Sequence, residues 1–156
     1  MAASAAGLAF LIAAVQAEGL RVGPEKQGAL FRGGERNASG AEETAYVVAP
    51  VDDGLRTVLE LNVAADNWNR CLTINEYLCI ECDTTSDLTT QNKPVPCWSY
   101  NSEIEAIPGA NPDYYDLRVT TRGTVLKWPE DAEDAFLAPA DGVELYRFSE
   151  GGYRHE

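Results

Sequence analysis

Short runs of alternating apolar and polar residues fill the chain from Thr44 onward. Leu59, Leu61 and Val63 alternate with Glu60 and Asn62, which is the period of a strand with one buried face. Prolines, glycines and Asn/Asp clusters separate the runs and mark turns between them. Gly123 is interpreted as a turn or bulge between two strands. The predicted strands are residues 45–51, 55–63, 97–100, 114–128 and 143–148.

One short helix is predicted at residues 129–137, PEDAEDAFL. Proline stands at its first position and acidic residues fill its first turn, where they complement the helix dipole. Strands and long helices do not alternate, which disfavours a doubly wound sheet. Residues 44–156 are therefore expected to form a mainly β domain, a small antiparallel sandwich or barrel-like structure with one short helix. The tail from Ser149 is expected to fray.

Residues 1–17, MAASAAGLAFLIAAVQA, form an apolar segment without a charged side chain. The segment is shorter than the roughly 20 apolar residues of a membrane-spanning helix. Small residues at Val15 and Ala17 fit a signal-peptidase site, with Glu18 as the first mature residue. The alternative is an apolar helix that is retained and buried in an assembly or against lipid. Under either interpretation an N-terminal apolar helix precedes the β domain.

Residues 18–43 are rich in glycine and in charges of both signs, with no sustained period. This composition predicts a flexible arm or linker. Asn37-Ala38-Ser39 matches the sequon for N-glycosylation, which a eukaryotic secreted chain would use at Asn37. A three-residue match in a polar segment also arises by chance.

Four cysteines, Cys71, Cys79, Cys82 and Cys97, lie in the spacing C-x7-C-x2-C-x14-C. Two disulfides are expected, because an exported chain uses cysteine mainly in structural bridges. A hairpin turning near Asn75 would pair Cys71 with Cys79 and leave Cys82 to pair with Cys97. A zinc site formed by the four thiolates is the minority alternative, because a second C-x2-C pair is missing. A redox dithiol at Cys79 and Cys82 lacks the usual βαβ context.

Acidic residues outnumber basic ones by 25 to 12, for a formal net charge of −13. Such a surface repels phosphate backbones and anionic lipid headgroups, so neither nucleic acid nor a membrane is an expected partner, except through residues 1–17. The single histidine, His155, stands beside the end of the sequence. A frayed tail is a poor place for a general base, which disfavours Ser–His–Asp and Cys–His enzymes. A protein without catalytic residues and without a cofactor is expected.

Aromatic residues beside predicted loops are the candidate binding residues, because Trp and Tyr offer rigid area with a polar group. They are Trp68, Tyr114 and Tyr115. The expected function is that of an exported, non-catalytic structural or interaction subunit. It would act outside the cytoplasm and join protein partners in a larger assembly such as a pilus, a virion or a membrane-associated complex. The alternative is a secreted monomeric binding module or inhibitor that recognises a cationic protein or a glycan.

Overall fold

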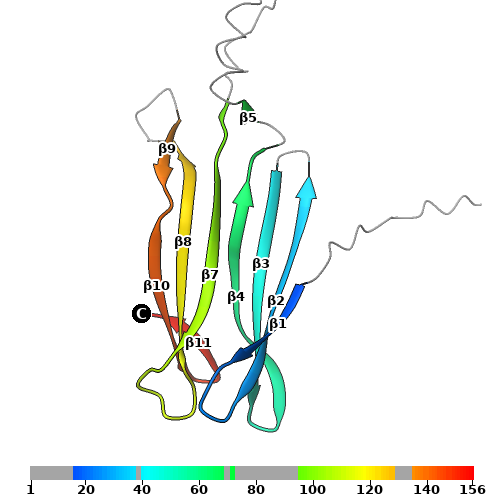
Figure 1. The fold of residues 1–156 in the computed structure, drawn as a ribbon, viewed down its shortest axis with the longest axis vertical. Coiled ribbons are helices and arrows are strands. Elements are labelled where there is room, and N and C mark those ends of the chain that lie inside the picture. Colours follow the sequence, from blue (N-terminus) through cyan, green and yellow to red (C-terminus); the bar gives the residue numbers. More distant parts are fainter. Residues whose placement is uncertain (1–15, 38–39, 69–70, 73–94, 129–134) are drawn as a thin grey trace, which may run out of the picture.

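The fold is a single antiparallel β-sheet with a small two-stranded addition (Figure 1). The computed structural model describes residues 16–37, 40–68, 71–72, 95–128 and 135–156. All regular structure within these ranges is β-strand, which confirms the prediction of a mainly β fold. The strands are β1 (Gln16–Arg21), β2 (Gln27–Asn37), β3 (Gly40–Val51), β4 (Gly54–Asp66), β5 (Cys71–Leu72), β6 (Val95–Pro96), β7 (Ser99–Ile107), β8 (Asp116–Lys127), β9 (Phe136–Pro139), β10 (Gly142–Ser149) and β11 (Gly152–His155).

Sequence neighbours are also neighbours in the sheet. The strand order is β1-β2-β3-β4-β7-β8-β10-β11, and β9 pairs with β8 beyond the end of β10. The segment between β4 and β7 carries β5 and β6, which pair in parallel. Short hairpin connections give this meander order, as the turn residues Asp52-Asp53-Gly54 between β3 and β4 illustrate.

The sheet has two halves, β1–β4 and β7–β11, that meet at a narrow seam. Only three residue pairs join β4 to β7, from Ala64 opposite Asn101 to Asp66 opposite Ser99. Away from this seam the halves enclose one core, which contains Leu30 and Val47 from the first half and Leu117 and Tyr146 from the second. Burial of these side chains is the main stabilising contribution.

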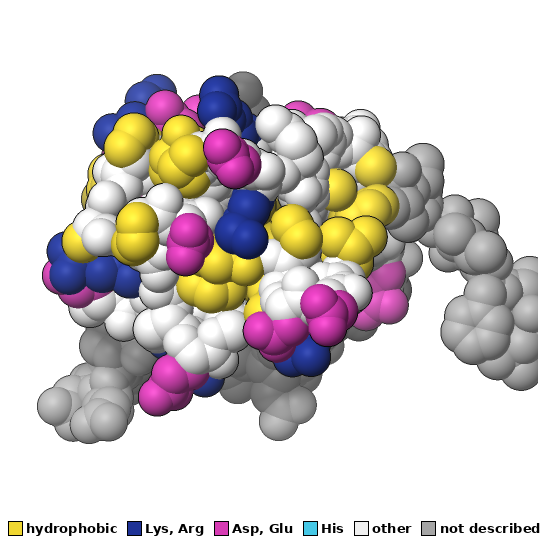
Figure 2. Space-filling view, turned by 90° about the horizontal axis from the view of Figure 1, so that it is seen from below, with side chains coloured by type: hydrophobic (Ala, Val, Ile, Leu, Met, Phe, Trp, Pro, Cys, Tyr) yellow, Lys and Arg dark blue, Asp and Glu magenta, His cyan; other side chains and the backbone are white. Residues whose placement is uncertain are grey.

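The halves also touch at the end of the sheet opposite the seam. The backbone N–H of Tyr115 donates to the carbonyl of Val22 at 2.8 Å. A Cβ atom on Gly152 of β11 would lie 3.3 Å from the carbonyl oxygen of Val58 in β4. Figure 2 shows the molecule from below, where hydrophobic side chains lie between acidic, basic and other polar ones. Polar side chains thus interrupt the apolar surface on this end.

Most of the described residues in the range 18–43 lie in strands, so the predicted flexible arm is wrong. They make up most of β1, all of β2 and the start of β3. Leu30 anchors β2, because its side chain is 1% exposed and belongs to the core. Gly34 permits close packing of β2 on β3, since a Cβ there would lie 2.3 Å from the carbonyl oxygen of Glu42. Gly28 and Gly34, two of the glycines that suggested a linker, serve strand packing instead.

Two further expectations concern the C-terminal region. Phe136 and Leu137, the end of the predicted helix, lie in β9, while residues 129–134 lie outside the described residues. The tail forms β11, because Tyr153 is buried and donates a hydrogen bond from its hydroxyl to the Tyr115 carbonyl at 2.9 Å. Pairing with β10 and the burial of Tyr153 together order this short strand. Of the predicted N-terminal helix, residues 1–17, the first 15 also lie outside the described part, while Gln16 and Ala17 lie in β1 and are not helical.

Gly123 lies within one continuous strand, β8, and does not separate two strands. Its φ is 131°, and it stands opposite Tyr100 of β7. Asp141 accepts a hydrogen bond from its N–H at 2.9 Å, and Ala140 donates to its carbonyl at 2.9 Å. These two bonds join β8 to the residues between β9 and β10, where the ladder with β8 is interrupted. A Cβ at Gly123 would lie 2.2 Å from the carbonyl oxygen of Ser99, so glycine is required there.

Candidate functional site: a groove across the sheet

An open groove of about 700 Å³ crosses the sheet near the seam between its halves. Its walls come from β2, β3, β4, β7 and β8, together with Gln16 of β1 and Trp68 after β4. Pockets of this size hold small ligands or a short stretch of a partner chain. The groove, hereafter the seam groove, is the candidate binding site.

On β2, β3 and β4, five residues of the seam groove lining are glycine or alanine. They are Gly33, Gly34, Ala41, Ala64 and Ala65. Because these residues have little or no side chain, an occupant can approach the strand backbone closely. The longer polar and aromatic side chains of the lining therefore decide what binds.

Two arginines of the groove are already held by acidic neighbours. The Arg32 guanidinium lies 3.3 Å from a Glu43 carboxylate oxygen and donates to the Ser102 carbonyl at 3.2 Å. Arg36 lies 3.6 Å from a carboxylate oxygen of Asp66. Exposed pairs of this kind contribute little stability, about 0–1 kcal/mol, but they neutralise both partners.

Glu35 and Glu42 stand opposite each other across β2 and β3. Both are exposed, and neither has a hydrogen bond or ion pair within the described part of the chain. Like charges at directly opposite positions repel each other. Within the described ranges the seam groove thus contains two carboxylates without an ion-pair partner, while its third arginine, Arg122, lies exposed in β8.

Tyr100 is the half-buried aromatic residue of the groove. Its ring stacks on Trp98, with centroids 6.3 Å apart and planes 9° from parallel. Burial raises the pKa of the Tyr100 hydroxyl, and the negative charge of Glu42 raises it further. Tyr100 therefore stays a neutral hydrogen-bonding group next to the Glu42 carboxylate.

Glu42→Gln is expected to lower the pKa of Tyr100, because the amide removes a negative charge that disfavours the phenolate. A pH titration of ¹³C-labelled tyrosine, with Tyr100→Phe to assign the resonance, measures the shift. Glu60→Gln changes the same charge on an exposed residue outside the groove and should leave this pKa in place. An unchanged pKa in Glu42→Gln would show that the two groups do not interact.

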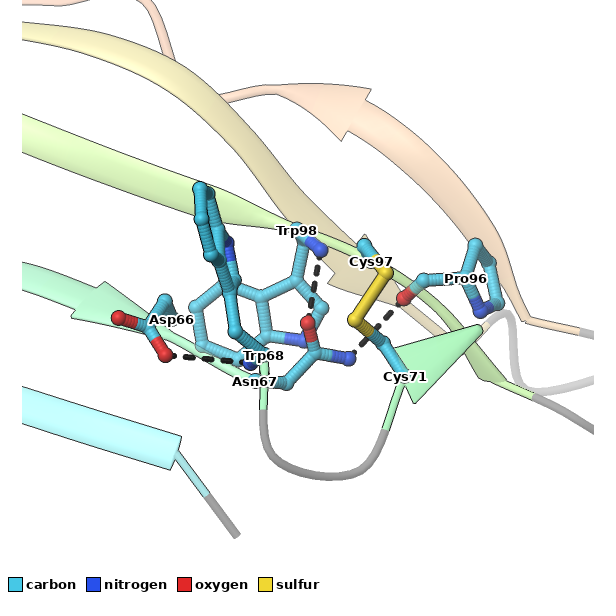
Figure 3. The surroundings of a disulfide bond; sticks show 7 residues. All are labelled: Asp66, Asn67, Trp68, Cys71, Pro96, Cys97 and Trp98. Carbon is cyan, nitrogen blue, oxygen red and sulfur yellow. Dashed lines mark hydrogen bonds between the residues drawn. A yellow bond between two sulfur atoms is a disulfide. The ribbon is translucent and has the colours of Figure 1, made fainter. Parts of the chain in front are cut away.

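Trp68 is positioned by the last residues of β4. Its backbone N–H donates to the Asp66 carboxylate at 3.1 Å (Figure 3), and the residue is 67% exposed. The preceding residue, Asn67, is buried and holds two segments of the chain. Its side-chain amide donates to the Pro96 carbonyl at 3.0 Å and accepts from the Trp98 N–H at 2.8 Å. These bonds fix Trp68 at one end of the groove.

A disulfide joins Cys71 to Cys97 next to the hydrogen bonds of Asn67, hereafter the Asn67 clamp (Figure 3). The observed bridge corrects the predicted pairing of Cys71 with Cys79 and of Cys82 with Cys97. β5 and β6 lie side by side, with Cys71 opposite Val95, so Cys71 meets the far end of the segment and not a residue within it. The bridge also removes two of the four thiolates that the zinc alternative requires. Cys79 and Cys82 lie outside the described residues.

The three predicted binding aromatics have different environments. Trp68 is exposed and lines the groove. Tyr114 is 8% exposed: its ring stacks on Phe148, and its hydroxyl donates to the Pro50 carbonyl at 2.6 Å. Its predicted exposure is therefore wrong, because the ring packs in the protein interior. Tyr115 is half-buried. Its backbone N–H donates to the carbonyl of Val22, the residue after β1, and its carbonyl accepts from the Tyr153 hydroxyl of β11.

Two other residues singled out in the sequence lie in strands. Asn37, the sequon asparagine, is exposed at the end of β2, and its use for glycosylation stays a prediction. His155 is exposed in β11, with its ring edge-on to Tyr146 at 5.3 Å.

Sequence reasoning missed Glu35, Glu42 and Tyr100, the residues that characterise the groove. Glu35 and Glu42 fall in the segment that was interpreted as an arm, so their pairing was not foreseen. The pairing depends on the register of β2 against β3, which the mixed charges and glycines of this segment do not specify.

Within the described ranges, no group of three or more His, Cys, Asp or Glu side chains could hold a metal ion. No helix in the same ranges is long and apolar enough to cross a membrane. The sequence matches no protein-family model, and no curated protein and no solved structure shows significant similarity to it.

Proposed function

We propose that this protein is an exported, non-catalytic interaction subunit that joins protein partners in a larger assembly. The seam groove carries this proposal, because it is an open site on the sheet. A disulfide bridges the chain segment that connects the two halves of this sheet. The Cys71–Cys97 bridge supports a location outside the cytoplasm, where disulfides persist. The two halves around one core support a sandwich-like description of the domain.

The N-terminal segment bears on how the subunit would be anchored. Gln16 and Ala17 form the first two residues of β1 and stand opposite Arg32 and Phe31. Signal-peptide cleavage before Glu18 would therefore shorten β1 but leave its pairing from Glu18 to Arg21. A retained segment would instead stay attached to β1, the edge strand of the sheet.

A secreted monomeric binding module is the second candidate. Its support is the exposed Trp68 indole in the groove, since exposed aromatic rings contact both glycans and protein partners. The two candidates share the groove and differ in anchoring and oligomeric state.

Sedimentation velocity and intact mass of the natively expressed protein separate these functions. The subunit proposal expects a mass beginning at Met1 or Ala2 and concentration-dependent association, alone or with co-purified partner chains. The mass before and after reduction also gives the number of disulfides. A mass beginning at Glu18, with a monomer at every concentration, would contradict the subunit proposal and favour the binding module.

A further inference from the structure

The free charges of the seam groove are unevenly distributed. Arg32 and Arg36 are matched by Glu43 and Asp66, so these four residues contribute no net charge. The opposed carboxylates of Glu35 and Glu42 remain without a cation in the described part of the chain. A positive group placed between them would relieve their mutual repulsion and bind both.

Aromatic rings stand beside this negative position. Ala65 of β4 has Glu42 as its neighbour on one side and Tyr100 on the other, so Glu42 and Tyr100 are two strands apart. The effect of Glu42 on the pKa of Tyr100 is consistent with this proximity. Trp68 adds an exposed indole to the lining. Carboxylates next to aromatic faces are suited to ammonium and guanidinium groups, which gain both ion pairing and cation–π attraction.

We propose that the seam groove binds a lysine or arginine side chain on an extended segment of a protein partner, with the cation between Glu35 and Glu42 and beside Tyr100. The inference rests on the proposed function, because it takes a protein partner as the occupant. It adds the chemistry by which that partner is recognised.

The dimensions of the groove favour a chain segment over a small amine. Neighbouring strands are about 4.8 Å apart, so the three spacings from β3 to β8 correspond to about 14 Å. At the β8 side, Arg122 and Asn101 are exposed and stand opposite each other. Both can donate hydrogen bonds to carbonyl oxygens of an extended backbone. The net charge of −13 also attracts basic segments and speeds their encounter.

The test uses a capped hexapeptide, acetyl-Gly-Ser-Arg-Gly-Ser-Gly-amide, whose only charge is the guanidinium. Added to the isotope-labelled native protein, it should shift the NMR resonances of Tyr100, Trp68 and Gly33 in a saturable manner. The double variant Glu35→Gln/Glu42→Gln should bind about tenfold more weakly, as expected when charge-assisted contacts are lost. Added salt should weaken the wild-type interaction.

Matched variants separate the groove from general attraction to an acidic surface. Glu60→Gln removes one negative charge outside the groove and should leave binding unchanged. Trp68→Ala should weaken binding, whereas Trp128→Ala should not, although the two indoles are 67% and 65% exposed. The assignment to the groove would be overturned if Glu60→Gln weakened binding as much as Glu35→Gln/Glu42→Gln does. It would also be overturned if Trp128→Ala weakened binding as much as Trp68→Ala does.

A peptide with citrulline in place of arginine tests the charge itself. Binding equal to that of the arginine peptide would overturn the inference, as would the absence of any shift in groove resonances with the arginine peptide. If chitotetraose, a neutral oligosaccharide, shifts these resonances and the peptide does not, the occupant is a glycan and the inference fails. The subunit proposal is judged separately by sedimentation and mass, so its failure is distinguishable from this one.

Discussion

Replacing both Cys71 and Cys97 by serine is expected to lower the free energy of unfolding by about 3.5 kcal/mol. The bridge closes a loop between residues 26 positions apart, and loop-closure entropy for that length gives a value of this size. Serine keeps the size of the half-buried side chains, so packing changes little. Urea unfolding of the oxidised wild type and of the double variant measures the difference.

The same experiment needs proof of which cysteines are joined. Peptide mapping without reduction should give one fragment that contains both Cys71 and Cys97. A fragment that joins Cys71 to Cys79 would contradict the structure at this point, and equal urea midpoints would show that the bridge contributes nothing to stability.

Asn67→Ala is expected to destabilise the fold by about 3 kcal/mol. The change leaves the Trp98 backbone N–H and the Pro96 carbonyl, both in half-buried residues, without their partner. An unsatisfied group costs about 1–3 kcal/mol when it is fully buried, so the lower half of this range applies to each. The backbone of Asn67 still binds Trp98 and Cys71, so the strands should remain in register. Thermal unfolding and hydrogen exchange at the Trp98 amide report the loss.

Asn67→Asp is the matched variant for this clamp. Its carboxyl keeps the acceptor for Trp98 but meets the Pro96 carbonyl oxygen, so it must carry a proton to donate there. Its pKa in the folded variant is therefore raised above the unfolded value of about 3.9. The protonated carboxyl therefore contributes to the folding stability of the variant at a pH below its pKa in the unfolded chain. This contribution is lost as the pH rises through the pKa of the same carboxyl in the folded variant. A variant as stable as the wild type at neutral pH would show that the donor side of the clamp is unimportant.

The strand-rich character of residues 44–156 was predictable because alternation is a local property. Leu59, Leu61 and Val63 mark β4, whose described bounds are Gly54–Asp66. β1 and β2 were not predicted, since their glycines and charges lack a local strand signal. β2 is ordered by pairing with β3, and β1 by pairing with β2. β11 was missed for the same reason: its polar residues lack a local strand signal, and its pairing with β10 and the contact of Tyr153 with Tyr115 order it.

The candidate site was less predictable than the fold. Trp68 was chosen correctly as an exposed aromatic residue, because turn residues surround it. Tyr114 follows the same local pattern but is drawn inward by Phe148, 34 residues away in the sequence. The Glu35–Glu42 pair depends on a cross-strand register, and a sequence pattern specifies such a register only when one face is clearly apolar.

The Cys71–Cys97 bridge also changes what a break in the backbone would do. The chain passes from the first half of the sheet to the second through the segment between these residues, and the disulfide offers a parallel covalent path. A protease cut between residues 72 and 96 would therefore leave the two halves as one molecule under oxidising conditions. Reduction would then release them as separate chains, held only by the three-pair seam and the shared core. An intact and a nicked form could thus coexist with the same mass apart from one added water, and would differ in stability only once the bridge is reduced.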